Sequence, residues 1–136
     1  MIRLTLNGAP ATLSSPTRRL SQGLREEAGL TGTKVGCDAG DCGACTVRLD
    51  GRQVCACLVA IGQVEGRAVE TVEGLADSDG TLARLQESFL AHGAAQCGIC
   101  TPGMLMAAKD LLYRKAQPAR SDVEDALGGV LCRCTG

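Results

Sequence analysis

Residues 36–45 read GCDAGDCGAC, which places three cysteines, Cys37, Cys42 and Cys45, at C-x4-C-x2-C spacing. A fourth cysteine, Cys57, follows after eleven further residues and completes a quartet. Four thiolates at this spacing are typical of proteins that hold a plant-type [2Fe–2S] cluster. The stretch therefore predicts an iron–sulfur loop, and with it a protein whose work is electron transfer.

Three glycines, Gly36, Gly40 and Gly43, interleave with these cysteines. Glycine permits the positive-φ turns that wrap a loop around a cluster, and it lets amide N–H groups come close to sulfur. A zinc site is the alternative for the same thiolates, but zinc sites more often use paired C-x2–4-C knuckles. A Rieske centre is excluded, because it needs two histidines per cluster and His92 is the only histidine.

Cys55 and Cys57 compete for the fourth ligand position of this first quartet. They lie two residues apart, so on an extended strand both side chains would point to the same face. Spacing alone does not choose between them.

A second quartet has the pattern Cys97-x2-Cys100-x31-Cys132-x1-Cys134. The first pair comes directly before a predicted helix and the second pair follows another, so two helices would present one pair each to a shared point. Amides at a helix N-terminus near Cys100 would stabilise the negative charge of a cluster. Zinc is a stronger alternative here, because this spacing is less diagnostic.

The hydrophobic pattern changes along the chain from alternation to helical periodicity, which predicts an α+β fold. The first part is expected to contain a hairpin of Ile2–Leu6 and Ala9–Leu13 around Asn7-Gly8, a helix over Arg18–Ala28 capped by Thr17 and ended by Gly29, a second hairpin of Thr46–Leu49 and Gln53–Ala56, and a strand over Ala68–Thr71.

From Thr81 onward the pattern predicts helices. The expected elements are a helix from Thr81 to near Gly93; a helix with Thr101 as N-cap, Pro102 at its first position and an apolar face of Met104, Leu105, Ala108, Leu111 and Leu112; and a helix that starts at a Ser121-x-x-Glu124 capping box and ends at Gly128-Gly129. Residues Glu73–Gly80 are the predicted linker, which divides the chain into domains over 1–75 and 76–136.

Composition narrows the class of protein. Fourteen Lys and Arg against fifteen Asp and Glu give a net charge of −1, which predicts no nucleic-acid partner. No run approaches the ~20 apolar residues of a membrane span, and no signal peptide precedes the first strand, so we expect no membrane insertion and a cytoplasmic location. In that reducing compartment, nine cysteines, an odd number, favour metal binding over disulfides.

Four motifs in order resemble the iron–sulfur subunit of the xanthine oxidase family, the molybdenum hydroxylases and their relatives such as carbon monoxide dehydrogenase, aldehyde oxidoreductases and 4-hydroxybenzoyl-CoA reductase. The motifs are GTKVGC at 32–37, GDCGACTV at 40–47, QCGICTPG at 96–103 and LCRCTG at 131–136. The resemblance covers essentially the whole chain. Members of the family usually continue past the position that matches Gly136, with a tyrosine and a short helix.

The resemblance implies a β-grasp, plant-type ferredoxin-like domain followed by a four-helix domain, each with one [2Fe–2S] cluster. The match at Ala56-Cys57-Leu58 implies that Cys57 is the fourth ligand of the first cluster and that Cys55 is a free thiol. In the second site, the family uses the residues that match Gln96 and Cys134 to contact the pterin of the molybdenum cofactor.

The family also implies a function and partners. Catalysis would occur on a large molybdopterin-binding subunit, and this chain would relay electrons through the second cluster and then the first to FAD on a medium subunit, or to another acceptor. No residue of this chain would be catalytic. Two alternatives stay open: a free-standing two-cluster ferredoxin, and a cysteine-rich zinc interaction module.

Overall fold

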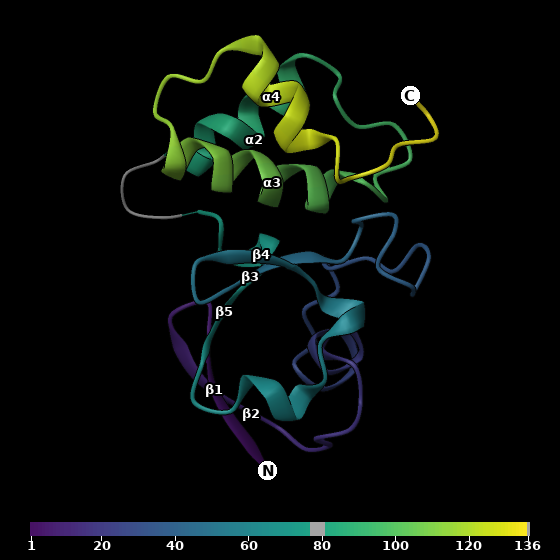
Figure 1. The fold of residues 1–136 in the computed structure, drawn as a ribbon, viewed down its shortest axis with the longest axis vertical. Helices are drawn as coiled ribbons and strands as arrows, with labels where there is room; N and C mark the ends of the chain where they lie inside the picture. The colour runs from purple at the N-terminus through teal and green to yellow at the C-terminus, as the bar shows by residue number, and fades with distance from the viewer. Residues whose placement is uncertain (77–80, 136) are drawn as a thin grey trace.

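A five-stranded mixed sheet forms the N-terminal part of the chain, and helices lie above it (Figure 1). The structure, a computed structural model, describes residues 1–76 and 81–135. Its strands are β1 (Ile2–Leu6), β2 (Ala9–Leu13), β3 (Thr46–Leu49), β4 (Arg52–Cys55) and β5 (Ala68–Glu70). Its α-helices are α1 (Leu20–Gln22), α2 (Thr81–Ala91), α3 (Thr101–Arg114) and α4 (Arg120–Leu127). The predicted α+β class is confirmed.

The strand order in the sheet is β2-β1-β5-β3-β4, with β1 and β5 parallel and the other neighbours antiparallel. Both predicted hairpins form. Asn7 and Gly8 have φ of 51° and 82°, and Asp50 and Gly51 have φ of 47° and 79°. Two successive positive-φ residues give the turn whose twist matches that of paired strands. β4 begins at Arg52, one residue before the predicted start, because this two-residue turn pairs Leu49 with Arg52.

The main hydrophobic core lies on one face of this sheet. Alternate residues of the strands, such as Val47 and Leu49 in β3, point into it, as the pleat of a strand requires. The opposite wall is built by Leu20 and Leu24 and by two 3-10 turns, Ala56–Leu58 and Ile61–Val64. Cys45, at the end of the glycine-rich cysteine loop, and the strand β3 that follows it are therefore part of the same core.

The helix predicted over Arg18–Ala28 starts later and is not regular. Arg19 is extended and forms a bridge with Ala60, so the helix begins at Leu20 and Thr17 does not cap it. It then widens into a π-helical turn over Gly23–Glu27, where the N–H of Ala28 donates to the carbonyl of Gly23. Gly29 ends the element with φ of 70°, in agreement with the prediction.

Helix α3 packs on β3 and β4, on the side of the sheet away from the main core, and also contacts α2 and α4 (Figure 1). The face predicted as apolar is therefore only partly right: Leu105 and Leu111 are buried, whereas Met104, Ala108 and Leu112 are half-buried. Met106, Ala107, Lys109 and Asp110 are buried as well. An element between two layers buries more than one stripe of its surface.

Charged groups join α3 to the sheet. The Asp110 carboxylate accepts a hydrogen bond from Gln53 at 2.9 Å and pairs with Arg114 at 2.9 Å and with Arg48 at 3.4 Å. Burial raises the pKa of Asp110, but these donors and cations outweigh it and hold the pKa below its usual value. The ionised carboxylate therefore helps to fix the helical part on the sheet.

Two predicted helix starts are also shifted. The N-cap of α3 is Cys100 and not Thr101, which is the first helical residue. The N-cap of α4 is Ala119, and the Asp122 carboxylate accepts the Ala119 N–H at 2.7 Å, so the capping interaction uses Asp122 in place of Glu124. Both shifts are only one or two residues, which is the range over which helix ends commonly vary.

The predicted linker Glu73–Gly80 lies partly outside the described residues, because 77–80 are not described. Its first residues form a 3-10 turn, Val72–Gly74, and Leu75 is fully buried against Leu105 and Met106. None of the helices in 1–76 and 81–135 combines the length and the apolar character needed to cross a lipid bilayer.

Candidate metal centres

The loop between α1 and β3 turns its backbone amides toward Cys37. The Cys37 sulfur accepts hydrogen bonds from the N–H groups of Ala39 (3.4 Å), Asp41 (3.2 Å) and Cys42 (3.3 Å). The N–H of Cys42, followed by those of Ala39 and Asp41, lowers the pKa of the Cys37 thiol to about 7. Such donors stabilise a thiolate, the form that ligates metal.

Cys45 and Cys57 form the buried side of the same site. Cys45 precedes β3 and Cys57 lies in the turn after β4, and the pairing of these strands brings the two together. The Cys57 N–H donates to the Cys45 sulfur at 3.4 Å. Burial raises the pKa of Cys45 to about 12. A thiol buried in this way ionises when a metal neutralises its charge, so the arrangement suits a metal ligand better than a free nucleophile.

The glycines of the loop are needed for its shape. A Cβ at Gly36 would lie 2.8 Å from the Cys42 sulfur, so a larger residue would displace that thiol. Gly40 and Gly43 have φ of 80° and 75°, which L-residues rarely adopt. The candidate donors are therefore thiols surrounded by amide N–H groups, in a loop whose three glycine positions leave no room for a side chain. This is the chemistry that an iron–sulfur cluster requires.

Cys55 lies beside the same loop. It ends β4, is half-buried, and directs its thiol toward the Gly40 carbonyl at 3.8 Å. Burial, followed by the charge of Cys57, raises the pKa of Cys55. The two cysteines do not share one extended strand, because Cys57 is in a 3-10 turn and is 3% exposed.

The second quartet is assembled from two segments of the helical part, the connection between α2 and α3 and the residues after α4. Cys97 and Cys100 come before α3, and Cys132 and Cys134 come after α4. The Ile99 N–H and then the Cys134 thiol lower the pKa of Cys97, whereas burial and then the Cys132 thiol raise the pKa of Cys100. Each cysteine of the first pair thus has a partner in the second pair.

Thr135, which the sequence pattern did not single out as a site residue, contacts this quartet. Its hydroxyl and its N–H both donate to the Cys132 sulfur, at 2.9 Å and 3.4 Å. The hydroxyl, and then the N–H, lower the pKa of Cys132 to about 7. In the sequence, this contact could have been predicted from the position of the threonine. It lies three residues after Cys132, from where its hydroxyl can turn back onto the cysteine sulfur.

The two cysteine loops touch each other. The N–H of Leu131, next to Cys132, donates to the carbonyl of Cys42 at 2.8 Å. Gly43 packs against the backbone of Gly129 and Val130, and a Cβ on Gly43 would collide with the backbone of both residues. One hydrogen bond thus joins a cysteine of the first quartet to the residue next to a cysteine of the second.

Gln96, predicted to face a pterin, is exposed and directly precedes Cys97. Cys134 is exposed too. Ile99 and Leu131, which flank ligands of the same quartet, are 47% and 61% exposed. The second quartet therefore opens onto a surface that carries apolar side chains.

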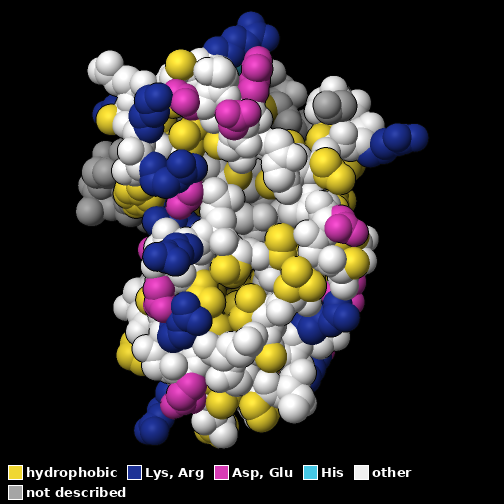
Figure 2. All heavy atoms as spheres, in the orientation of Figure 1, with side chains coloured by type: hydrophobic (Ala, Val, Ile, Leu, Met, Phe, Trp, Pro, Cys, Tyr) yellow, Lys and Arg dark blue, Asp and Glu magenta, His cyan; other side chains and the backbone are white. Residues whose placement is uncertain are grey.

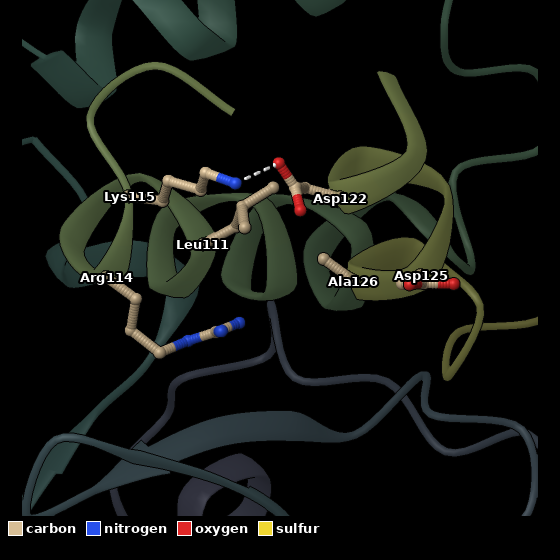
Figure 3. A pocket seen from close by; sticks show the side chains of 6 residues that line it. All are labelled: Leu111, Arg114, Lys115, Asp122, Asp125 and Ala126. Carbon is tan, nitrogen blue, oxygen red and sulfur yellow. Dashed lines mark hydrogen bonds and ion pairs between the residues drawn. The ribbon is translucent and has the colours of Figure 1, made fainter. Parts of the chain in front are cut away.

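A hollow of about 380 Å³ between α3 and α4 is lined by charged side chains (Figure 3). Lys115 and Asp122 pair across it at 2.6 Å. On the face in Figure 2, Lys and Arg alternate with Asp and Glu along one edge, and the pairs Arg48–Glu70 and Arg67–Asp50 belong to the sheet. These charges hold elements together, and the hollow contains no cysteine.

Two groups of four cysteines, one in a glycine-rich loop with N–H···S bonds and one between helix ends, have the donor types and the spacing of an iron–sulfur protein. Within the described residues, no group of three or more His, Cys, Asp or Glu side chains converges closely enough for one metal ion. The assignment of clusters to the quartets thus depends on spacing, on the donors around sulfur and on the relatives of the chain.

Comparison with known proteins gives the family. Residues 4–83 match a 2Fe-2S iron-sulfur cluster binding domain, and residues 71–136 match a [2Fe-2S] binding domain. The chain is 46% identical to the nicotinate dehydrogenase small FeS subunit of Eubacterium barkeri, over 99% of this chain and 86% of that one. It is 47% identical to the nicotine 6-hydroxylase small subunit of Paenarthrobacter nicotinovorans, over 99% and 81%.

The fold agrees with this comparison. The crystal structure of quinoline 2-oxidoreductase from Pseudomonas putida 86 superposes with a TM-score of 0.92 at 46% identity, covering 99% of this chain and 83% of that one. The chain therefore belongs to the small iron–sulfur subunits of the xanthine oxidase, or molybdenum hydroxylase, family, as its motifs suggested. It is the iron–sulfur subunit of an oxidoreductase.

Proposed function

We propose that this chain relays electrons between a molybdenum cofactor on a large subunit and FAD, or another acceptor, on a further subunit. The observation that carries the proposal is the contact between the two quartets. The Leu131 N–H to Cys42 carbonyl bond, 2.8 Å long, joins loops that are about ninety residues apart in sequence. A relay needs two redox centres held at a short, fixed separation, and this contact between the two cysteine loops supports that arrangement.

Each quartet holds one [2Fe–2S] cluster in this proposal. The first is held by Cys37, Cys42, Cys45 and Cys57, and the second by Cys97, Cys100, Cys132 and Cys134. When bound, the clusters supply one-electron transfer, and the chain supplies position and environment. Backbone N–H groups that donate to the Cys37 sulfur would make one side of the first cluster polar. The buried surroundings of Cys45 and Cys57 would keep water away from its other side.

The second cluster faces the molybdenum subunit in this arrangement. Gln96 and Cys134 are exposed beside it, which leaves the Gln96 amide free to reach the polar edge of a pterin on the partner. The exposed Ile99 and Leu131 would be covered by the same partner, because apolar side chains of this size gain from burial at an interface.

We propose the division into domains over 1–75 and 76–136, with a β-grasp, ferredoxin-like first domain and a four-helix second domain. The mixed sheet packed on α1 supports the first assignment. Helices α2, α3 and α4, with a core of Leu105 and Met106 that also takes in Leu75 at the boundary, support the second. We propose the cytoplasm as location, because none of the nine cysteines is paired in a disulfide and the cytoplasm keeps thiols reduced.

The test is isolation of the native assembly by a tag on this chain. We expect a large complex with four irons and four acid-labile sulfides per copy of this chain, together with molybdenum and flavin. Two distinct [2Fe–2S] signals should be reduced by the substrate of the assembly. A monomer with four irons and no partner would support the two-cluster ferredoxin instead. Zinc in place of iron would support the zinc module.

A further inference from the structure

The side-chain hydroxyl of Thr135 donates a hydrogen bond to Cys132, a cysteine of the second quartet. The Thr135 Oγ1 is 2.9 Å from the Cys132 sulfur, and the Thr135 N–H reaches the same sulfur at 3.4 Å. The donors that surround Cys37, Cys42 and Cys45 in the first quartet are backbone N–H groups. A backbone donor survives substitution of its own side chain, whereas a hydroxyl depends on the residue type.

A hydrogen bond to a ligating sulfur acts on the cluster potential. Reduction adds one electron to the cluster, and part of that negative charge falls on the thiolate sulfurs. A donor to sulfur stabilises the reduced form more than the oxidised form, and so raises the reduction potential. Charge-assisted bonds of this kind are also stronger than those between neutral groups.

We infer that the Thr135 hydroxyl is a positioning and tuning group that raises the reduction potential of the second cluster through its bond to the Cys132 thiolate. The inference rests on the proposed function, because it assumes a [2Fe–2S] cluster at this quartet. In the relay, this donor makes the second cluster a better acceptor for electrons that leave the molybdenum site. The same hydroxyl also gives the second cluster a reduction potential different from that of the first, through a single residue.

The experiment compares Thr135→Val with Thr135→Ser in the native complex. Valine matches the shape of threonine and keeps the backbone N–H but removes the hydroxyl, whereas serine keeps the hydroxyl. Redox titration followed by EPR gives the midpoint potential of each cluster separately. We expect the second cluster to shift to lower potential in Thr135→Val and to stay near the wild-type value in Thr135→Ser. The first cluster, unchanged in both, is the internal reference.

Resonance Raman spectra in H2O and D2O provide a second readout. The Fe–S(Cys) stretch of the second cluster should show a smaller solvent-isotope shift in Thr135→Val than in the wild type. If valine prevents assembly of the second cluster, Thr135→Ala is compared with Thr135→Ser in its place, and a lower potential for alanine supports the inference. Equal potentials with and without the hydroxyl, in a protein that retains four irons, would overturn it. Absence of the second [2Fe–2S] signal from the wild type would instead refute the proposed function.

Discussion

Cys55 and Cys57 show how one residue position decides a metal site. Both lie close to the Cys37–Cys45 loop, but Cys57 is buried and donates its N–H to the Cys45 sulfur at 3.4 Å. Cys55 is half-buried, and its thiol points to the Gly40 carbonyl. A cluster ligand has to be held in place by the surrounding backbone, and Cys57 meets that condition better.

We therefore expect Cys57→Ser to lose the first cluster and Cys55→Ser to retain both. Iron and sulfide content and the visible absorption of the purified protein measure the outcome: about two irons per chain for the first variant and about four for the second, because a [2Fe–2S] cluster contains two irons. The two substitutions make the same chemical change two residues apart, so each is the control for the other. The opposite result would mean that the ligand is Cys55.

Gln96 is the other residue for which we propose an individual role. We expect Gln96→Ala to leave both clusters intact and to slow their reduction by substrate, or to lower the molybdenum content. The residue is not a thiolate, so cluster assembly does not need it, whereas an unpaired polar edge of the pterin would cost about 1–3 kcal/mol. Stopped-flow reduction and metal analysis test this, with Gln96→Glu to separate hydrogen bonding from size. Wild-type rates and molybdenum content would show that Gln96 does not face the pterin.

At the scale of elements, the π-helical turn of Gly23–Glu27 gives an unexpected reason for a glycine. Sequence reasoning treats Gly23 as a cost, since glycine is about 1 kcal/mol worse than alanine in a helix. In the fold, a Cβ at this position would lie 2.7 Å from Ile61 and 3.2 Å from Leu13. The glycine lets the helix approach the wall of the main core.

Gly23→Ala is thus expected to destabilise the protein in spite of the better helix propensity. Overpacking a close core contact costs about 1–3 kcal/mol, which exceeds the propensity gain. The melting temperature of the iron-loaded protein should fall by several degrees. Gly129→Ala is the matched control, because a Cβ there meets no heavy atom within 4 Å. An increase in the melting temperature of Gly23→Ala would contradict the contact with Ile61.

At the scale of the whole molecule, the two parts of the chain differ in how much core they have. The main core contains thirteen buried residues, whereas the second core contains Leu75, Leu105 and Met106, and outside it the helical part buries a few single apolar residues, Ala107, Leu111 and Val130. Helix α4 contains no buried residue. A core of this size does not offset the loss of chain entropy by itself.

Removal of iron should therefore unfold the helical part first. A cluster ligated by the α2–α3 connection and by the residues after α4 would contribute its binding free energy to folding. After chelation we expect a large loss of helical circular dichroism at 222 nm and rapid amide exchange in α2 and α4, with slower exchange kept in β1 and β3. A cooperative melting transition of the helices in the iron-free chain would show that their packing alone is sufficient.

Local sequence was enough for the features that depend on neighbours in the chain. The Asn7-Gly8 and Asp50-Gly51 turns, the loop glycines and the strands followed from residue types with restricted backbone conformations. The two cysteine quartets were visible in their spacing, because thiolates that share a cluster leave a fixed pattern along the chain. The family followed from four motifs, and the relatives confirmed it.

Other features depend on residues that are distant in sequence, and only the tertiary structure decided them. The start of α1 at Leu20 results from the Arg19–Ala60 bridge, and the burial of Lys109 and Asp110 results from the packing of α3 on the sheet. The contact of Cys42 with Leu131 arises because the chain ends its last helix beside the Cys37–Cys45 loop. Sequence periodicity records which residues a segment can bury, whereas the partner that buries them is set by the assembled fold.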